Sequence, residues 1–518
     1  MQPWPKRPII YEINTWVWLN ELSRRHGRDI TLATVPPEEW DDLAAMGSDA
    51  VWLMGVWERS PAGTDIALGN QLLLADFRKA LPDLEPSDIV GSPYCIAGYR
   101  VDEHLGGPEG LALARESLSI RGLRLILDFV PNHVAPDHPW VRSHPDYFVR
   151  GSEEDIETQG SSFIEVEGTV FARGKDPYFP AWPDVLQLNA FHHGLRHAVI
   201  ETLSGIAGHC DGVRCDMAML VMSDVFETTW GTRAGVRPAR EYWPEVIEAV
   251  RQRRPGFLFI AEAYWDLEWE LQQQGFDFCY DKLLYDRLGH ESAESVKVHL
   301  LADRDYQDRL LRFIENHDEP RAAAAFPRSE EVVAAITAYA VPGAKLFHEG
   351  QIEGRKVKLP VFLGRRPEEP IDESLRGFYQ KLLRVINSPA LRDGEWRLCE
   401  RIGWTDNATY LDILAWCWLK DDERYLSVVN LSAFRSQARV MVPWRDLSGS
   451  SWSLVDIFHG TTYEREGSEM VAPGLYIDLD AWGSHFFRVE RAEGATRAKD
   501  RVKGKVRAKT TGRRKDQG

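Results

Sequence analysis

Four short segments of the chain end apolar runs with ionisable side chains. In chain order they are Asp128-Phe-Val-Pro-Asn-His133, Gly212-Val-Arg-Cys-Asp216, Phe259-Ile-Ala-Glu262 and Phe313-Ile-Glu-Asn-His-Asp318. Cleaving a glycosidic bond with retention requires one carboxylate that attacks the anomeric carbon and one carboxylic acid that protonates the leaving oxygen. Apolar runs that repeatedly end in a carboxylate therefore indicate a sugar-cleaving site at the ends of several parallel strands.

Asp216 and Glu262 are the candidates for this pair of carboxyl groups. Arg214 lies two residues before Asp216, so both side chains of a strand would point to the same face. A fixed cation beside the attacking carboxylate keeps it ionised. A structural ion pair between Arg214 and Asp128 is an alternative, and one guanidinium can serve two carboxylates.

The four segments resemble the four signature regions of the α-amylase family of retaining glycoside hydrolases (glycoside hydrolase family 13). The resemblance extends over roughly residues 5 to 490, and Gln187-Leu-Asn189 is similar to a weaker fifth motif of that family. It implies that Asp216 is the nucleophile and that Glu262 is the general acid, which then becomes the base.

The same resemblance implies roles for further residues. Asp318 matches the third carboxylate of the family, which holds sugar hydroxyls and stabilises the distorted ring. His133 and His317 match histidines that hydrogen-bond the hydroxyls of the same sugar unit. Tyr99, in Pro93-Tyr-Cys-Ile-Ala-Gly-Tyr99, resembles the aromatic platform beneath that sugar. Buried histidines are often ordinary core residues, but these two adjoin the strand-end motifs.

Two departures bear on the substrate and on metals. Many starch-acting members carry a Lys-His pair shortly after the nucleophile, whereas Ala218-Met219-Leu220 occupy that stretch here. The asparagine that matches Asn132 is a calcium ligand in some members. Calcium needs six to eight oxygen ligands, and the sequence identifies none beyond Asn132. We therefore expect no required cofactor and assign no metal-binding residue, with calcium as an alternative that only Asn132 supports.

The elements that position these residues follow from the alternation of apolar runs with helical stretches, which predicts repeated strand-helix units. The eight apolar runs are Ile9–Trp16, Ala50–Trp57, Leu123–Val130, Gly212–Met217, Phe257–Tyr264, Phe276–Tyr280, Leu310–Glu315 and Ala344–His348. Several are almost continuously apolar, as strands buried on both faces are. The prediction is an α/β fold with a (β/α)₈ TIM barrel.

The sequence predicts four regions. Residues 1–133 and 196–396 would form the barrel, and residues 134–195, too long for a simple connection, an inserted small domain after the third strand. Short strand-like runs over residues 397–490 favour a C-terminal antiparallel β-sandwich. Residues 491–518 form a basic tail in which Lys and Arg exceed the acids by eight, which predicts disorder, with polyanion binding as the alternative.

Bulk composition limits the class of protein. The net charge is −17, and the acidic body is expected to repel nucleic acid. The first residues carry no apolar signal segment, no apolar stretch is long enough for a membrane span, and the six cysteines show no CxxC pair. We therefore expect a cytoplasmic protein with reduced thiols and no membrane partner; its oligomeric state is not indicated.

The hypothesis is a retaining hydrolase of α-glucosidic bonds, α-1,4 bonds above all, in maltooligosaccharides or glycogen-type glucans. A glucanotransferase or a disaccharide-acting (trehalose- or sucrose-type) enzyme of the same family is the nearest alternative, because hydrolysis and transfer differ only in which acceptor resolves the glycosyl-enzyme. A non-catalytic sugar-binding scaffold is the remote alternative, since this chain keeps all three carboxylates.

Overall fold

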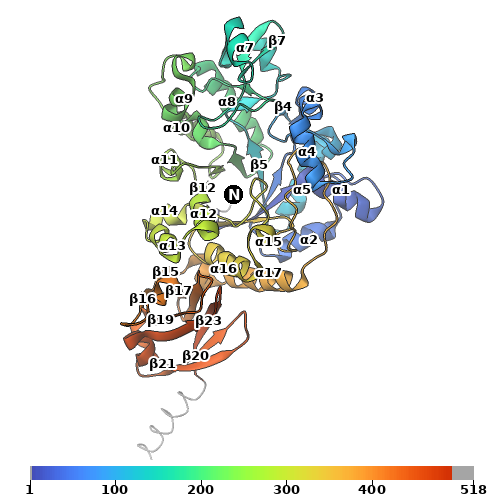
Figure 1. Ribbon diagram of the computed structural model, residues 1–518. Helices are drawn as coiled ribbons and strands as arrows, with labels where there is room; N and C mark the ends of the chain where they lie inside the picture. Colours follow the sequence, from blue (N-terminus) through green and yellow to red (C-terminus); the bar gives the residue numbers. More distant parts are fainter. Residues whose placement is uncertain (1–2, 493–518) are drawn as a thin grey trace, which may run out of the picture. The chain divides into compact units, whose positions relative to one another are not determined.

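The computed structural model describes residues 3–492, and the chain forms two compact units (Figure 1). The first unit comprises Met1–Asp286, Asp303–Pro327 and Pro342–Gln380, and the second comprises Arg287–Ala302, Arg328–Val341 and Lys381–Gly518. The second unit thus includes three stretches, residues 287–302, 328–341 and 381–396, that lie within the barrel ranges expected from the sequence. The predicted tail, from residue 493 onward, lies outside the described residues.

Eight parallel strands of the first unit close into a barrel in the order β1-β14-β13-β12-β11-β10-β5-β2. The strands are β1 Ile9–Asn14, β2 Ala50–Met54, β5 Arg124–Phe129, β10 Gly212–Cys215, β11 Leu258–Ala261, β12 Phe278–Tyr280, β13 Leu310–Arg312 and β14 Ala344–His348. Each overlaps one of the eight apolar runs. The predicted (β/α)₈ barrel is confirmed.

The strands are buried along nearly their whole length, because one face lines the barrel interior and the other packs against helices. The strand register brings the polar residues near the ends of β5, β10 and β11 to the same level of the barrel. Arg214 of β10 lies opposite Asp128 of β5 and opposite Ile260 of β11, two residues before Glu262. Gly212 begins β10, where a Cβ atom would lie 2.7 Å from Leu258 Cβ and so crowd the neighbouring strand. The ionisable residues therefore gather at one end of the barrel.

Helices connect successive barrel strands (Figure 1). Those of the first unit include α1 Thr15–His26, α2 Pro37–Ala45, α3 Pro61–Gly69, α4 Gln71–Ala80, α5 Gly107–Ser119, α8 His193–Ile206, α9 Ser223–Trp230, α10 Tyr242–Arg253, α11 Glu268–Gln273, α14 Arg304–Asp308 and α15 Ala322–Ala325. Between β12 and β14 run α12 Lys282–His290, α13 Ala293–Leu300 and α16 Arg328–Tyr339, and α17 Glu373–Ile386 follows β14.

The stretch between β5 and α8 carries short elements of its own. They are β6 His133–Val134, α6 Trp140–Ser143, α7 Glu153–Gln159, β7 Phe163–Val166, β8 Thr169–Ala172 and β9 Leu186–Gln187. β7 and β8 form an antiparallel hairpin, and β6 pairs with β9. The second pairing joins the start of the stretch to its end. A further antiparallel pair, β3 Trp57–Arg59 with β4 Ile96–Val101, follows β2.

The second unit contains two antiparallel sheets. The six-stranded sheet consists of β15 Glu395–Leu398, β17 Ile413–Lys420, β18 Glu423–Asn430, β23 Ser484–Arg491, β20 Ser451–Asp456 and β21 Thr462–Glu466. The three-stranded sheet consists of β16 Glu400–Ile402, β19 Ser436–Met441 and β22 Leu475–Leu479, and α18 Pro389–Asp393 precedes β15. Residues from both sheets form one apolar core, as the predicted antiparallel C-terminal region requires.

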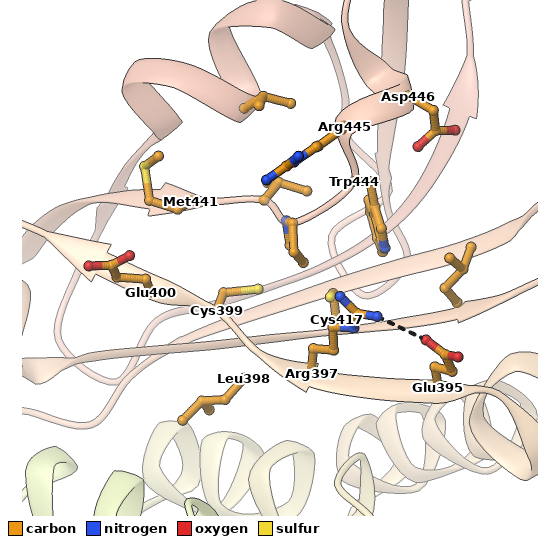
Figure 2. A pocket seen from close by; sticks show the side chains of 14 residues that line it. Glu395, Arg397, Leu398, Cys399, Glu400, Cys417, Met441, Trp444, Arg445 and Asp446 are labelled. Carbon is orange, nitrogen blue, oxygen red and sulfur yellow. Dashed lines mark hydrogen bonds and ion pairs between the residues drawn. The ribbon is translucent and has the colours of Figure 1, made fainter.

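A pocket of about 800 Å³ opens in this second unit (Figure 2). Its lining includes the thiols of Cys399 and Cys417, the indole of Trp444 and the ion pair of Arg397 with Glu395 at 3.2 Å. None of the sequence-predicted catalytic residues lines it.

Candidate active site

Arg214 joins the three predicted catalytic carboxylates. One terminal nitrogen of its guanidinium lies 2.7 Å from Asp216 Oδ1, and the other lies 2.8 Å from Glu262 Oε2 and 3.7 Å from Asp318 Oδ2. Arg214, Asp216 and Glu262 are almost completely buried, whereas the Asp318 side chain is 39% exposed. The structure therefore brings residues from three strand ends of the barrel to one planar cation.

Glu262 is held in a setting that favours its protonated form. Its Oε2 accepts a hydrogen bond from Met217 N at 2.6 Å, and its Oε1 accepts one from the Tyr264 hydroxyl at 2.7 Å. Burial and the negative charges of Asp216 and Asp318 outweigh the opposing effects of Arg214 and of the Met217 hydrogen bond and raise the pKa of Glu262 to about 7. A carboxyl group with such a pKa can give a proton near neutral pH.

The backbone next to Asp216 adopts a conformation that side chains rarely occupy. Met217 has a φ of +42°, and this left-handed turn directs its N–H towards Glu262. Residues 218–221, the stretch that departs from the resembled motif, form a buried 3₁₀ turn. The Ala218 carbonyl accepts a hydrogen bond from Trp243 Nε1 at 2.8 Å. Strain of this kind persists where the surrounding structure fixes it, as it does at functional sites.

His317 links Asp318 to the first barrel strand. Its Nε2 lies 2.9 Å from Asp318 Oδ2 and 2.7 Å from the Tyr94 hydroxyl, and its Nδ1 lies 2.5 Å from Glu12 Oε1. Burial alone would lower the pKa of His317, but Asp318 and Glu12 raise it to about 10, so the ring is an imidazolium at neutral pH.

That cation acts on Asp318 in turn. Although burial opposes it, His317, Arg214 and Lys358 hold the pKa of Asp318 well below its ordinary value. Lys358 Nζ also donates a hydrogen bond to the Asp318 backbone carbonyl. Two carboxyl groups on the same arginine thus have pKa values pushed in opposite directions, which separates a proton donor from a permanent anion.

Asp128 has a different environment from the three carboxylates on Arg214. It accepts hydrogen bonds from Trp52 Nε1 at 3.1 Å and Gly55 N at 2.8 Å. Burial raises its pKa to about 6 although Arg214 opposes the shift. The alternative that Arg214 chiefly serves Asp128 is therefore not supported by its closest contacts, which go to Asp216 and Glu262.

The other two predicted substrate-binding residues lie nearby. Tyr99 is partly buried, and its hydroxyl donates to the Val130 carbonyl at 3.1 Å and accepts from Val130 N at 2.9 Å. His133 is buried, its ring centroid lies 5.1 Å from that of Trp182, and burial lowers its pKa while Asp216 opposes the shift. The negative charge of Asp216 acts to raise the pKa of both residues, and their roles towards a sugar stay predictions.

The surroundings of Asn132 do not fit a calcium site. Gln187 Nε2 donates to Asn132 Oδ1 at 2.8 Å and to the Asn132 carbonyl at 3.0 Å, while Asn132 Nδ2 donates to Gln187 Oε1 at 3.2 Å. The amide oxygens that would bind a cation are thus engaged by N–H donors. A hard cation needs several free oxygen ligands at one point.

Sequence reasoning missed three residues in this network: Glu12, Tyr94 and Tyr264. The guanidinium carbon of Arg214 lies 5.1 Å from the centre of the Tyr94 ring. Glu12 carried a usable signal, because it is an acid inside the apolar run Ile9–Trp16, the first of the eight predicted strands. Tyr264 lies two residues after Glu262 in the sequence run Phe257–Tyr264, a spacing that places both side chains on one face of an extended segment. Tyr94 lies in a loop, where the pattern of apolar residues does not predict which way a side chain points.

Known proteins resemble this chain in sequence and in fold. No protein-family model matches it. It is 25% identical over 402 residues to the α-amylase MalA of Haloarcula japonica, covering 75% of this chain and 50% of the relative. It is 20% identical over 401 residues to an α-1,4-glucan:maltose-1-phosphate maltosyltransferase of Picrophilus torridus, covering 73% and 57%. The chain thus spans about half the length of these curated relatives.

Solved structures share the fold over nearly the whole chain. A maltogenic α-amylase, AmyB of Thermotoga neapolitana, has a TM-score of 0.65 at 19% identity and covers 94% of this chain and 99% of its own. The acarbose complex of a Geobacillus thermoleovorans α-amylase has a TM-score of 0.65 at 17% identity, covering 95% and 100%. Within residues 3–492, no helix combines the length and apolar character of a membrane span.

The chain thus has carboxylates at the strand ends of its barrel, is similar in sequence to curated α-amylases, and shares its fold with solved α-amylases. These similarities in sequence and in fold support the resemblance to the α-amylase family of glycoside hydrolases.

Proposed function

We propose that the protein is a retaining glycoside hydrolase that cleaves α-glucosidic bonds, α-1,4 bonds above all, in maltooligosaccharides or glycogen-type glucans. One observation carries the proposal: a single buried guanidinium contacts both Asp216 and Glu262. Two carboxyl groups on one arginine are close neighbours, as a double displacement requires, whereas inversion needs room for a water between them. Asp318 on the same cation supplies a third anionic group.

In the first step, Asp216 attacks the anomeric carbon while Glu262 protonates the oxygen of the leaving sugar. The bond from the anomeric carbon to that oxygen breaks, and an ester bond to Asp216 forms. Arg214 lies 2.7 Å from Asp216 Oδ1 and so holds the attacking carboxylate in place. Because its pKa is raised to about 7, the Glu262 carboxyl group carries the proton that it donates near neutral pH. Asp318, held anionic by His317, accepts hydrogen bonds from sugar hydroxyls.

In the second step, Glu262 is a carboxylate and takes a proton from water. The resulting hydroxide attacks the anomeric carbon, the ester to Asp216 breaks, and both carboxyl groups return to their starting states. The scheme balances without a metal or an organic cofactor.

Transfer to a sugar hydroxyl is the second candidate. A curated relative that matches 73% of this chain is named a maltosyltransferase. Only the acceptor in the second step would change, since the glycosyl-enzyme is common to both reactions.

Product analysis from pure maltoheptaose, with Asp216→Asn and Glu262→Gln as variants, tests the proposal. We expect shorter maltooligosaccharides from the wild-type protein and loss of turnover in Asp216→Asn with unchanged circular dichroism. Products both longer and shorter than the substrate would establish the transferase instead. Unchanged turnover in Asp216→Asn would refute the nucleophile assignment, and no reaction of the wild-type protein would favour a disaccharide substrate or a sugar-binding scaffold.

We infer further that the protein works in a reducing compartment such as the cytoplasm. All six cysteines are buried free thiols, and burial raises the pKa of Cys95 and Cys215 well above the ordinary value. Fractionation of cells that produce the protein tests this location; recovery of the protein outside the cell would contradict it.

A further inference from the structure

Three side chains of the second unit present metal-ligating atoms to one another, independently of the candidate active site. They are Asp456 at the end of β20, His459 in the following turn and His485 in β23. One carboxylate oxygen and one imidazole nitrogen from each histidine lie within 4.8 Å of one another. Among residues 3–492 these three form the one such cluster of histidine, cysteine and acidic side chains.

The carboxylate is the fixed centre of the cluster. Asp456 is fully buried, and its Oδ2 lies 3.0 Å from His459 Nδ1 and 2.6 Å from His485 Nδ1. Its Oδ1 accepts hydrogen bonds from the backbone N–H groups of Phe458 and His459 at 3.2 and 3.3 Å. Nitrogen and oxygen ligands about 2.1 Å from a tetrahedral zinc ion lie about 3.4 Å apart. The two oxygen–nitrogen distances, 3.0 and 2.6 Å, would therefore lengthen by less than about 1 Å on binding.

Neighbouring elements hold two of the three ligands in place. Asp456 pairs with Phe487 across β20 and β23, and the ring of His485 stacks on Phe487 with centroids 4.8 Å apart. The Tyr463 ring packs edge-on against His485 at 5.8 Å. The His459 side chain is 54% exposed, so this third ligand has room to adjust and leaves the site open to solvent.

We propose that Asp456, His459 and His485 bind one divalent transition-metal ion of the zinc type, with water in the remaining positions. Two imidazoles and one carboxylate suit zinc, cobalt or nickel, whereas calcium and magnesium prefer sites made only of oxygen ligands. The ion would tie the β20–β21 turn to β23 and so stabilise the second unit.

Protons compete with the metal at this site. Although burial opposes it, hydrogen bonds from both histidines hold the pKa of Asp456 well below its ordinary value, and Asp456 raises the pKa of His459. Lys381 faces the turn, donates to the Phe458 carbonyl at 3.1 Å and opposes the shift at His459.

Zinc titration of the chelator-treated full chain by isothermal calorimetry tests the site. We expect one zinc site per chain. His459→Gln and His485→Gln should each lower its zinc affinity by at least about tenfold, because losing only a hydrogen-bond partner of a metal ligand already lowers metal affinity by about that factor. His290→Gln is the matched control, because His290 is an exposed histidine of the same unit and lies outside the cluster. Excess calcium should leave zinc binding unchanged.

Cobalt supplies a readout that does not depend on any variant's folding. Co²⁺ added to the wild-type chain should develop visible absorption bands of a nitrogen- and oxygen-ligated ion, and zinc should remove them. The proposal is overturned if zinc affinity is the same in wild type, His459→Gln and His485→Gln, or if cobalt keeps the spectrum of the free aqueous ion. Neither outcome bears on glycosidase activity, so the two proposals fail separately.

Discussion

At the scale of single residues, the candidate site is organised by two cations of different kinds. Arg214 is a permanent cation that spans the carboxylates, whereas His317 is a cation only because Asp318 and Glu12 stabilise its proton. Glu262 is the carboxyl group that neither cation keeps ionised near pH 7, since burial and the adjacent anions prevail. The charges around the three carboxyl groups therefore mark Glu262 as the proton donor even without a bound substrate.

The pH dependence of kcat/KM should show an alkaline limb set by Glu262. The acid must be protonated to act, and its pKa is raised to about 7, so activity falls as pH rises through about 7. Glu262→Gln should lower kcat by about 10²–10⁴ and remove this limb. Glu270→Gln, at an exposed position of α11, is the control. A profile that still rises above neutral pH would contradict the assignment.

Glu12→Gln should change stability in a pH-dependent way. The pKa of His317 is raised from 6.5 to about 10 in the folded protein, so its charged form adds stability that is full below about 6.5 and is lost as pH rises through about 10. The variant should therefore unfold more easily than wild type at pH 6.5, with a difference that shrinks towards pH 10. Urea unfolding across this range measures it, with the ¹⁵N shift of the His317 ring as a direct report. Parallel stability curves would rule out the coupling.

At the scale of elements, strand pairing fixes the geometry of the site. β10 and β11 are adjacent and parallel, and each delivers one carboxylate just beyond its last residue. Gly212 permits their close approach at the start of β10. A change at that end of the pair, remote along the strand from Asp216, should therefore alter the site.

Gly212→Ala should destabilise the protein by about 1–3 kcal/mol and lower kcat, because the added Cβ would lie 2.7 Å from Leu258 Cβ on β11. Gly205→Ala is the matched control: a Cβ at this position of α8 meets nothing within 4 Å, and alanine favours a helix interior by roughly 0.5–1 kcal/mol. Denaturant unfolding and maltoheptaose turnover measure the pair. Equal stability of the two variants would disprove the crowding argument.

The strands were predictable because apolar residues buried on both faces leave a continuous pattern, as in Leu125–Leu127 of β5. The strand-end acids followed from the same runs. The hairpin β7–β8 could not be predicted, since its strands are four residues each and only partly buried. Nor could the approach of Tyr94 to His317, which depends on the tertiary path of a loop. The pairing of β6 with β9 could not be predicted either, because two residues are too few to show an alternating pattern.

At the scale of the whole molecule, the second unit is not a simple C-terminal appendage. Within it, Trp416 Nε1 and Trp418 Nε1 both donate to the Ala340 carbonyl at 2.9 and 2.7 Å. Arg401, nearly buried, pairs with Glu294 at 2.7 Å. Ala340 and Glu294 precede β14 in the chain, so segments that alternate with barrel strands have their partners after residue 397, where sequence patterns placed a boundary.

A chain that ends at Gly394 should therefore be insoluble or misfolded, because it exposes apolar surface of α16, whose residues Val333–Tyr339 are buried. A chain that ends at Ala492 should keep full activity on maltoheptaose, because the candidate site lies within the described residues. Size-exclusion chromatography and turnover of both truncations measure this. A soluble, active chain ending at Gly394 would show the second unit to be dispensable.

The six cysteines have a practical consequence for work on the folded protein. Each is at most 5% exposed, and alkylating reagents react with accessible thiolates. The native chain should resist iodoacetamide and maleimides, and labelling should begin only where a segment opens. A single cysteine introduced on the surface would therefore carry a fluorophore without background, and mass-resolved labelling of the native thiols would time the opening of each unit separately.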